Sequence, residues 1–161
     1  MSTIFTRLLI AGGALLLCAA LAQAQDVALR QGMQASAAQV QSLARTPPVV
    51  IGTRSVWPIP SAPALDEDGK VRQNATLVIR SSDRLVGLSS NDLVVIYADT
   101  AAVSAAASGL VQQVSAFPRM GMTVLHVSTF GQLQPLYQTL VAKFPAAHFD
   151  LPVRYAMQRA R

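Results

Sequence analysis

The stretch of residues 123–157 constrains the fold most, because it predicts a strand, a helix and a second strand in succession. It opens with a short apolar run over residues 123–127. Apolar residues then recur at steps of three and four over residues 133–144, the spacing of one apolar stripe on a helix. Pro145 ends that helix, because proline has no N–H and disfavours helical backbone at the preceding residue. Over residues 149–157 apolar side chains occupy every second position, which predicts a strand with one buried face.

Three further strands are predicted upstream of this unit. Residues 76–80 and 85–88 are strand-like and flank the polar residues 81–84, which predicts a hairpin with a four-residue loop. Residues 93–98 form an unbroken apolar run rich in β-branched side chains. Such a run is typical of a central strand with little exposed on either face.

An alanine-rich segment, residues 101–108, predicts a helix after this central strand. Asp99 or Thr100 can cap it by accepting a bond from a free N–H group of its first turn. Gly109 then provides a left-handed stop. Residues 110–117 alternate and therefore favour a strand, although a helix that continues through Gly109 is the alternative.

The order of these elements predicts an α+β fold over residues 74–161. A leading hairpin followed by β-α-β-β-α-β is typical of a ferredoxin-like sandwich, in which both helices cover one face of an antiparallel sheet. The last strand is expected at the sheet edge, because Pro152 is tolerated at edges and bulges. The helix-free face then needs a cover from the hairpin, from an N-terminal helix or from another protein.

Residues 1–24 have the features of a secretory signal peptide. Arg7 precedes an apolar core at residues 8–20, and small residues at 22–24 form a cleavage site. The core is shorter than the roughly 18–20 residues that span a bilayer, so a retained anchor is the weaker interpretation. A lipid anchor on Cys18 is a second alternative. The sequence thus predicts an exported protein, periplasmic or secreted, with no membrane attachment after cleavage.

Two segments separate the signal from the predicted α+β domain. Residues 25–45 predict a helical extension with a narrow apolar stripe that Gly32 weakens, either a frayed extension or a helix that docks on a partner. Residues 46–73 are proline-rich and predict an extended linker. Trp57 lies within this linker and either contacts a partner or folds back onto its own domain.

The sequence contains no recognisable catalytic or metal-binding constellation, and we therefore expect no enzyme, no cofactor and no metal site. His126 and His148 have no second ligand at a metal-binding spacing. The acidic turn at residues 66–68 lacks the regular ligand spacing of a calcium loop. Cys18 is the single cysteine and lies in the leader, which excludes disulfides and a cysteine nucleophile from the mature chain.

The charge pattern argues against nucleic acid as a partner. The formal net charge is +5, but the basic residues are scattered except for Arg154, Arg159 and Arg161 near the end. No basic stripe is interleaved with aromatic residues, as nucleic-acid binding would require.

Several stretches between residues 91 and 161 follow one another in a recognisable order of elements and apolar spacing: Asn91-Asp92-Leu93-Val94-Val95, the alanine-rich helix, Gly109-Leu110, Ser115-Ala116-Phe117-Pro118, Val124-Leu125-His126-Val127 and Phe144-Pro145. In this order residues 91–161 resemble the propeptide domains of subtilisin-type serine proteases and the related stand-alone inhibitors. The resemblance implies that the helix-free sheet face packs on surface helices of a protease, and that the chain after the last strand lies in the active cleft like a substrate. Because no protease domain follows, the expected action is in trans, as an inhibitor or folding helper.

The tail that this resemblance places in a partner's cleft begins at residue 155. Alternate side chains of an extended tail fill pockets of such a cleft while its backbone adds strand-like hydrogen bonds. The alternative function is a small exported interaction or assembly module that binds another envelope protein through the open sheet face, Trp57 or the N-terminal helix. The partner-contacting tail residues are expected to be Tyr155, Met157, Gln158, Arg159 and Arg161.

Overall fold

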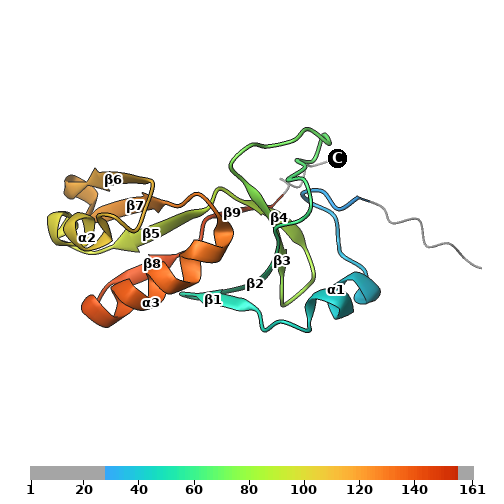
Figure 1. Cartoon of the computed structure of the whole chain (residues 1–161), viewed down its shortest axis with the longest axis horizontal. Coiled ribbons are helices and arrows are strands. Elements are labelled where there is room, and N and C mark those ends of the chain that lie inside the picture. Colours follow the sequence, from blue (N-terminus) through green and yellow to red (C-terminus); the bar gives the residue numbers. More distant parts are fainter. Residues whose placement is uncertain (1–27, 156–161) are drawn as a thin grey trace, which may run out of the picture.

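The structure is a computed structural model that describes residues 28–155, and it shows a mixed α+β fold (Figure 1). Within this range the chain forms two antiparallel sheets and three α-helices. The predicted signal peptide and most of the predicted tail lie outside the described residues.

The first sheet has five strands in the order β1-β2-β3-β4-β9. The predicted hairpin is confirmed, because β3 and β4 pair with Leu77 opposite Leu88, and Arg84 adopts a left-handed φ of 63° in the loop between them. The strands are β1 (Val49–Ile51), β2 (Arg54–Ile59), β3 (Thr76–Arg80), β4 (Val86–Ser89) and β9 (Val153–Arg154).

The prediction of a linker over residues 46–73 is wrong, because β1 and β2 form a hairpin that extends the first sheet. Val56 is fully buried, so this segment is part of the folded core. Pro58 is tolerated in β2 because it pairs with β3 only, the register with β1 ending at Val56. The Trp57 indole N–H donates to the Thr46 carbonyl at 3.2 Å, so Trp57 folds back onto its own domain.

The second sheet has four strands in the order β6-β7-β5-β8, and every neighbouring pair is antiparallel. β5 is central, as its apolar run predicted, and residues 113–117 form a strand rather than a helix. The Asp99 side chain caps α2 by accepting the Ala102 N–H at 2.9 Å, and Gly109 has a left-handed φ of 78°. The elements are β5 (Asp92–Ile96), α2 (Thr100–Ala107), β6 (Gln113–Phe117), the 3-10 turn η1 (Pro118–Met120), β7 (Met122–His126), the 3-10 turn η2 (Phe130–Gln132), α3 (Leu133–Lys143) and β8 (His148–Asp150).

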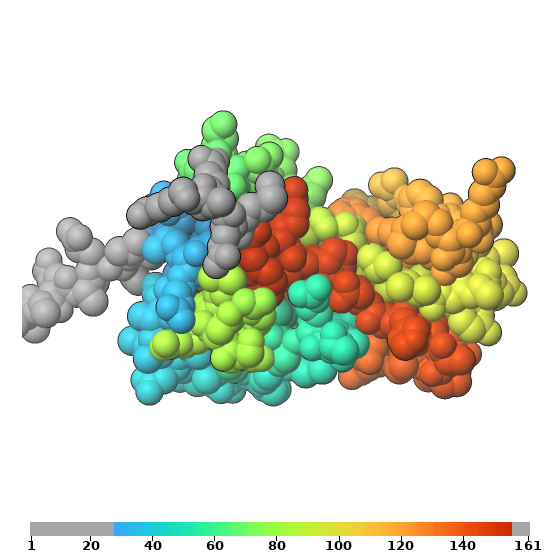
Figure 2. Space-filling view, turned by 180° about the vertical axis from the view of Figure 1, so that it is seen from behind, coloured from blue at the N-terminus to red at the C-terminus, as the bar shows by residue number. Residues whose placement is uncertain are grey.

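The expected single strand over residues 149–157 is instead two short strands that belong to different sheets. β8 pairs with β5 at the edge of the four-stranded sheet, and β9 pairs with β4 at the edge of the five-stranded sheet. Leu151 between them is fully buried, and Pro152 has no N–H with which to continue the first ladder. Seen from behind, the red segment of β8 and β9 runs along the middle of the molecule (Figure 2).

The predicted helix over residues 25–45 is much shorter in the structure. Only α1 (Ala37–Leu43) is helical, and Ser36 caps it by accepting the Gln39 N–H. Gly32 has a left-handed φ of 85°, and Gln34 forms an isolated bridge with Leu85. The segment before α1 therefore runs along the β3–β4 hairpin instead of continuing the helix.

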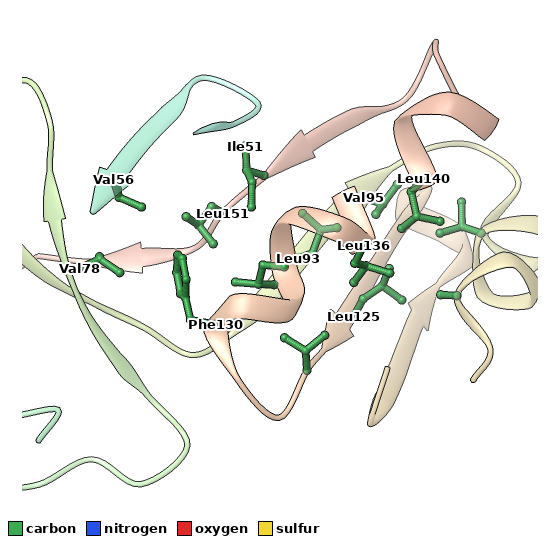
Figure 3. Packing of buried hydrophobic residues seen from close by; sticks show 14 residues of the cluster. Ile51, Val56, Val78, Leu93, Val95, Leu125, Phe130, Leu136, Leu140 and Leu151 are labelled. Atoms are coloured by element: carbon green, nitrogen blue, oxygen red, sulfur yellow. The ribbon is translucent and has the colours of Figure 1, made fainter. Parts of the chain in front are cut away.

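One apolar cluster joins the two sheets. Leu151 lies between residues of the five-stranded sheet and those of the four-stranded sheet, and Phe130 packs in the same cluster (Figure 3). Ile51, Val56 and Val78 come from the first sheet, whereas Leu93, Val95 and Leu125 come from the second sheet.

Candidate protein-binding surface

The four-stranded sheet has one face covered by helices and one helix-free face, which we call the open face. Successive side chains of a strand point to opposite sides of a sheet. On β5, Leu93 and Val95 are fully buried in the cluster that also contains residues of α2 and α3. Val94 and Ile96 therefore point to the other side, and Ile96 is 49% exposed. Figure 1 shows both helices on one side of this sheet.

Strand register arranges the open face in rows that cross the sheet. In the outermost row Phe117, Met122, Ile96 and His148 stand opposite one another on β6, β7, β5 and β8. The next row holds Ser115, Val124, Val94 and Asp150. The two rows together contain five apolar side chains. Ile96 and Phe117 are the exposed members of this set, and exposed apolar side chains grouped on one surface are typical of an interaction site.

A hydrogen-bonded polar group closes one end of the open face. His126 Nδ1 lies 2.8 Å from Asp92 Oδ1, and the Ser90 hydroxyl donates to Asp92 Oδ2 at 2.5 Å. In a serine-protease triad the histidine stands between the serine and the carboxylate. Here both groups bind the same carboxylate, so the arrangement lacks the bond between nucleophile and base. The contact between His126 and Asp92 joins β7 to β5.

The turn between β1 and β2 bounds the open face at its β8 edge. The Arg54 guanidinium Nε lies 3.2 Å from Asp150 Oδ1. Gly52 approaches the β8 backbone so closely that an added Cβ would lie 2.1 Å from the Phe149 carbonyl oxygen. The five-stranded sheet therefore meets the four-stranded sheet at β8, and β6 forms the opposite edge.

The β6 edge is followed by an apolar projection. Met120 in η1 is 66% exposed and Phe117 is 43% exposed. They line a shallow hollow of about 430 Å³ together with Ala116, Pro118 and Arg119. β6 contains no proline and no charged residue, which are the features that commonly protect a sheet edge against pairing. The open face, the β6 edge and η1 thus form one continuous candidate surface.

Tyr155 is the one predicted tail residue within the described range. Its ring lies against its own domain, with the Arg80 guanidinium carbon 4.4 Å from the ring centroid. Its side chain therefore contacts Arg80 rather than standing free for a partner. Met157, Gln158, Arg159 and Arg161 lie outside the described residues.

The acidic turn after the β1–β2 hairpin is a hydrogen-bonded loop. The buried Asp66 carboxylate accepts the N–H groups of Asp68 and Lys70 at 3.0 and 2.8 Å, and Arg72 Nε at 2.9 Å. The Lys70 N–H bond is the main cause that lowers the pKa of Asp66, and Arg72 lowers it further. Among the described residues, no group of three His, Cys, Asp or Glu side chains is placed to hold a metal ion.

Sequence reasoning did not identify the apolar residues of the open face. The two-residue alternation in β6 and β7 was a usable signal for Phe117 and Met122, but only strand order shows that they align with Ile96. Met120 carried no such signal, because it lies in the η1 turn.

No family model, curated protein or solved structure matches this chain. Between residues 28 and 155, none of the helices is long and apolar enough to cross a membrane.

Proposed function

We propose that this protein is an exported, non-catalytic partner of a subtilisin-type serine protease, which acts as a propeptide-like inhibitor or folding helper. In this proposal the chain from β5 onward is a ferredoxin-like unit. The succession β5-α2-β6-β7-α3-β8 and the strand order β6-β7-β5-β8 support that assignment. The proposal extends to the location of the protein, which is periplasmic or secreted.

The open face is the observation that carries the proposal. A propeptide-like domain needs an apolar sheet face that packs on surface helices of the protease. Ile96 and Phe117 are about half exposed and lie in one cross-strand row. Complete burial of each side chain against a partner would contribute about 1 kcal/mol, half of the value for a fully exposed residue. Val94, Met122 and Val124 extend the same surface.

The tail after β9 supplies the second contact in this proposal. It lies in the active cleft as an extended segment, with Met157, Gln158, Arg159 and Arg161 as the contacting residues. A folded domain behind the tail lowers the ordering cost of binding and so increases affinity. The tail follows β9, which belongs to the five-stranded sheet. It therefore does not continue directly from β8, the last strand of the ferredoxin-like unit.

The first experiment measures inhibition by the mature chain, residues 25–161. We expect it to slow hydrolysis of a peptide substrate by one or more subtilisin-type proteases. Deletion of residues 157–161 should abolish inhibition but preserve the circular dichroism spectrum and the melting temperature. No inhibition and no binding across a panel of such proteases would refute the proposal.

The second experiment tests the open face. The double variant Ile96→Ser/Phe117→Ser should lose roughly 2 kcal/mol of binding free energy, or roughly 30-fold in Kd, for a protease with its catalytic serine replaced. The matched control is Val50→Ser/Val71→Ser, because these residues are 48% and 63% exposed but lie outside the open face. Equal Kd values for the two double variants would exclude the open face as the contact.

A groove on the five-stranded sheet favours a second candidate function, an interaction or assembly module for another envelope protein. The groove has a volume of about 320 Å³ and lies between α1 and the chain after β2. It is lined mainly by apolar side chains, among them Leu29, Leu43 and Ile59. The proposed contact with a protease does not involve this groove.

A further inference from the structure

The Tyr155 ring packs directly on Gly87, in a position that is open only because residue 87 has no side chain. We call this position the seat of the ring. Gly87 is buried in β4, and an added Cβ would lie 2.8 and 2.9 Å from two carbon atoms of the Tyr155 ring. The same Cβ would lie 2.5 Å from Val153 Cγ1. Real Cβ atoms do not approach other carbons so closely, so any larger residue would displace the side chains of Val153 and Tyr155.

Arg80 packs on the same ring. Its guanidinium carbon lies 4.4 Å from the centroid of Tyr155, within the range of a cation–π contact. Arg80 Nε donates to Asp83 Oδ1 at 2.8 Å, and an Arg80 terminal nitrogen donates to Asp83 Oδ2. This two-point bond fixes the plane of the guanidinium group, because the fork of arginine matches the carboxylate geometry. The ring thus contacts both Gly87 and a guanidinium of fixed orientation.

Backbone pairing alone holds the chain only weakly at β9, just before Tyr155. β9 is two residues long and pairs with β4 through Val153 and Arg154. Apart from this pairing, Gln31 donates a side-chain bond to the Arg154 carbonyl at 3.2 Å. A ladder of this length has little stability by itself. The aromatic ring therefore adds a side-chain contact at the point where the backbone pairing ends.

We propose that Tyr155 is the anchor of the C-terminal tail, with Gly87 as its seat and Arg80 as its cover, and that it sets the position from which the tail reaches a partner. The part of this inference that concerns a protease cleft rests on the proposed function. Tyr155 is then a positioning residue, whereas the residues after it contact the partner. Its ring performs this task, because the ring carbons are the atoms that lie against Gly87 and the Arg80 guanidinium.

Cleavage by trypsin at the Arg154–Tyr155 bond tests the anchor without any protease partner. Proteolysis of a folded chain follows the population of its locally opened state. Tyr155→Ala and Gly87→Ala should therefore raise the cleavage rate at this bond about tenfold, as the loss of the seated ring increases opening. Tyr155→Phe should cleave at the parent rate. Gly131→Ala is the matched glycine control, because open space surrounds Gly131.

The same variants are then assayed for inhibition of a subtilisin-type protease. Tyr155→Ala should raise the inhibition constant about tenfold, because the tail must be ordered on binding, and Tyr155→Phe should restore the parent constant. A parent-like inhibition constant for Tyr155→Ala overturns the positioning role even where cleavage rises. A parent-like cleavage rate for both Tyr155→Ala and Gly87→Ala overturns the anchor itself.

The two proposals fail in different ways. A parent chain that neither inhibits nor binds any subtilisin-type protease refutes the proposed function, and the cleavage rates then decide the anchor by themselves. A parent chain that inhibits, with anchor variants that inhibit and resist trypsin equally well, refutes the anchor and leaves the proposed function intact.

Discussion

Asp66 illustrates how a single buried carboxylate organises a loop in this protein. It accepts two backbone N–H groups and the Arg72 side chain, and so closes the turn that the Leu65–Val71 bridge begins. These bonds require the ionised carboxylate, because a protonated acid cannot accept all of them equally well. The Asp66 carboxylate of this acidic turn therefore has a structural role.

The lowered pKa of Asp66 predicts a pH-dependent contribution to stability. The bond from Lys70 N–H, followed by the Arg72 charge, holds the pKa below the ordinary value of 3.8. Its stabilising effect is therefore complete above that value and is lost as the pH falls through the folded-state pKa. The melting temperature of Asp66→Asn should be lower than that of the parent at pH 7. The difference between the two melting temperatures should become smaller in acid. Thermal unfolding at pH 7 and pH 3 measures the effect, and a constant gap would contradict it.

Gly52 lies where the β1–β2 turn of the first sheet approaches β8 of the second sheet closely. It has a left-handed φ of 57°, and a Cβ would lie 2.1 Å from the Phe149 carbonyl oxygen. Gly52→Ala should therefore destabilise the fold by at least about 2 kcal/mol, from backbone strain and steric overlap together. Gly69→Ala is the control, because Gly69 has a φ of 79° and open space around it, so that strain acts alone. Urea unfolding measures the loss of unfolding free energy in both variants. Equal losses would exclude steric overlap with Phe149 as a cause of the effect at Gly52.

At the scale of elements, local patterns predicted most of the four-stranded sheet and its helices. The alternation in β6, the apolar run of β5 and the spacing in α3 each depend on neighbours within one element. β1 and β2 were missed, and β9 was predicted as a continuation of β8, because the pairing of these strands is decided by residues far away in the sequence. Pro58 and the neighbouring prolines made the β1–β2 segment resemble a linker, although proline is tolerated where a strand has one partner. The alternation over residues 149–157 resembled one continuous strand.

The Asp99 cap of α2 provides a test at the same scale. Its side chain accepts the Ala102 N–H at 2.9 Å, and α2 has only eight residues. Asp99→Ala should lower the free energy of unfolding by about 1 kcal/mol, whereas Asp99→Asn should retain most of it. Chemical unfolding monitored by circular dichroism compares the variants. An asparagine variant as unstable as the alanine variant would show that capping geometry is not the cause.

At the scale of the whole molecule, one apolar cluster makes the two sheets a single structural unit. Leu151 is fully buried at the point where the chain crosses from β8 to β9 (Figure 3). Ile51 and Leu93 belong to the same cluster but to different sheets. Since this cluster takes buried residues from both sheets, we expect the two sheets to unfold together.

Leu151→Ala tests this expectation. The loss of the buried side chain should cost about 2–5 kcal/mol, because the surrounding cluster cannot collapse around the cavity. Trp57 fluorescence follows the five-stranded sheet, whereas the helical circular dichroism signal follows mainly α2 and α3. Both should shift together in the variant and in the parent. Val71→Ala, at a residue that is 63% exposed, should change stability by less than about 0.5 kcal/mol. Separate transitions for the two probes would contradict a shared core.

The sequence by itself determined the α+β class, the order of the elements after Asn74 and the ends of α2 and α3. These features follow from side-chain period, caps and proline, which act over a few residues. The tertiary structure alone decided that the proline-rich segment joins a sheet and that β8 and β9 part at Pro152. It also decided that Gly87 seats Tyr155 and that Ile96 aligns with Phe117. Such contacts join residues distant in sequence, and their free energy depends on geometry that no local pattern records.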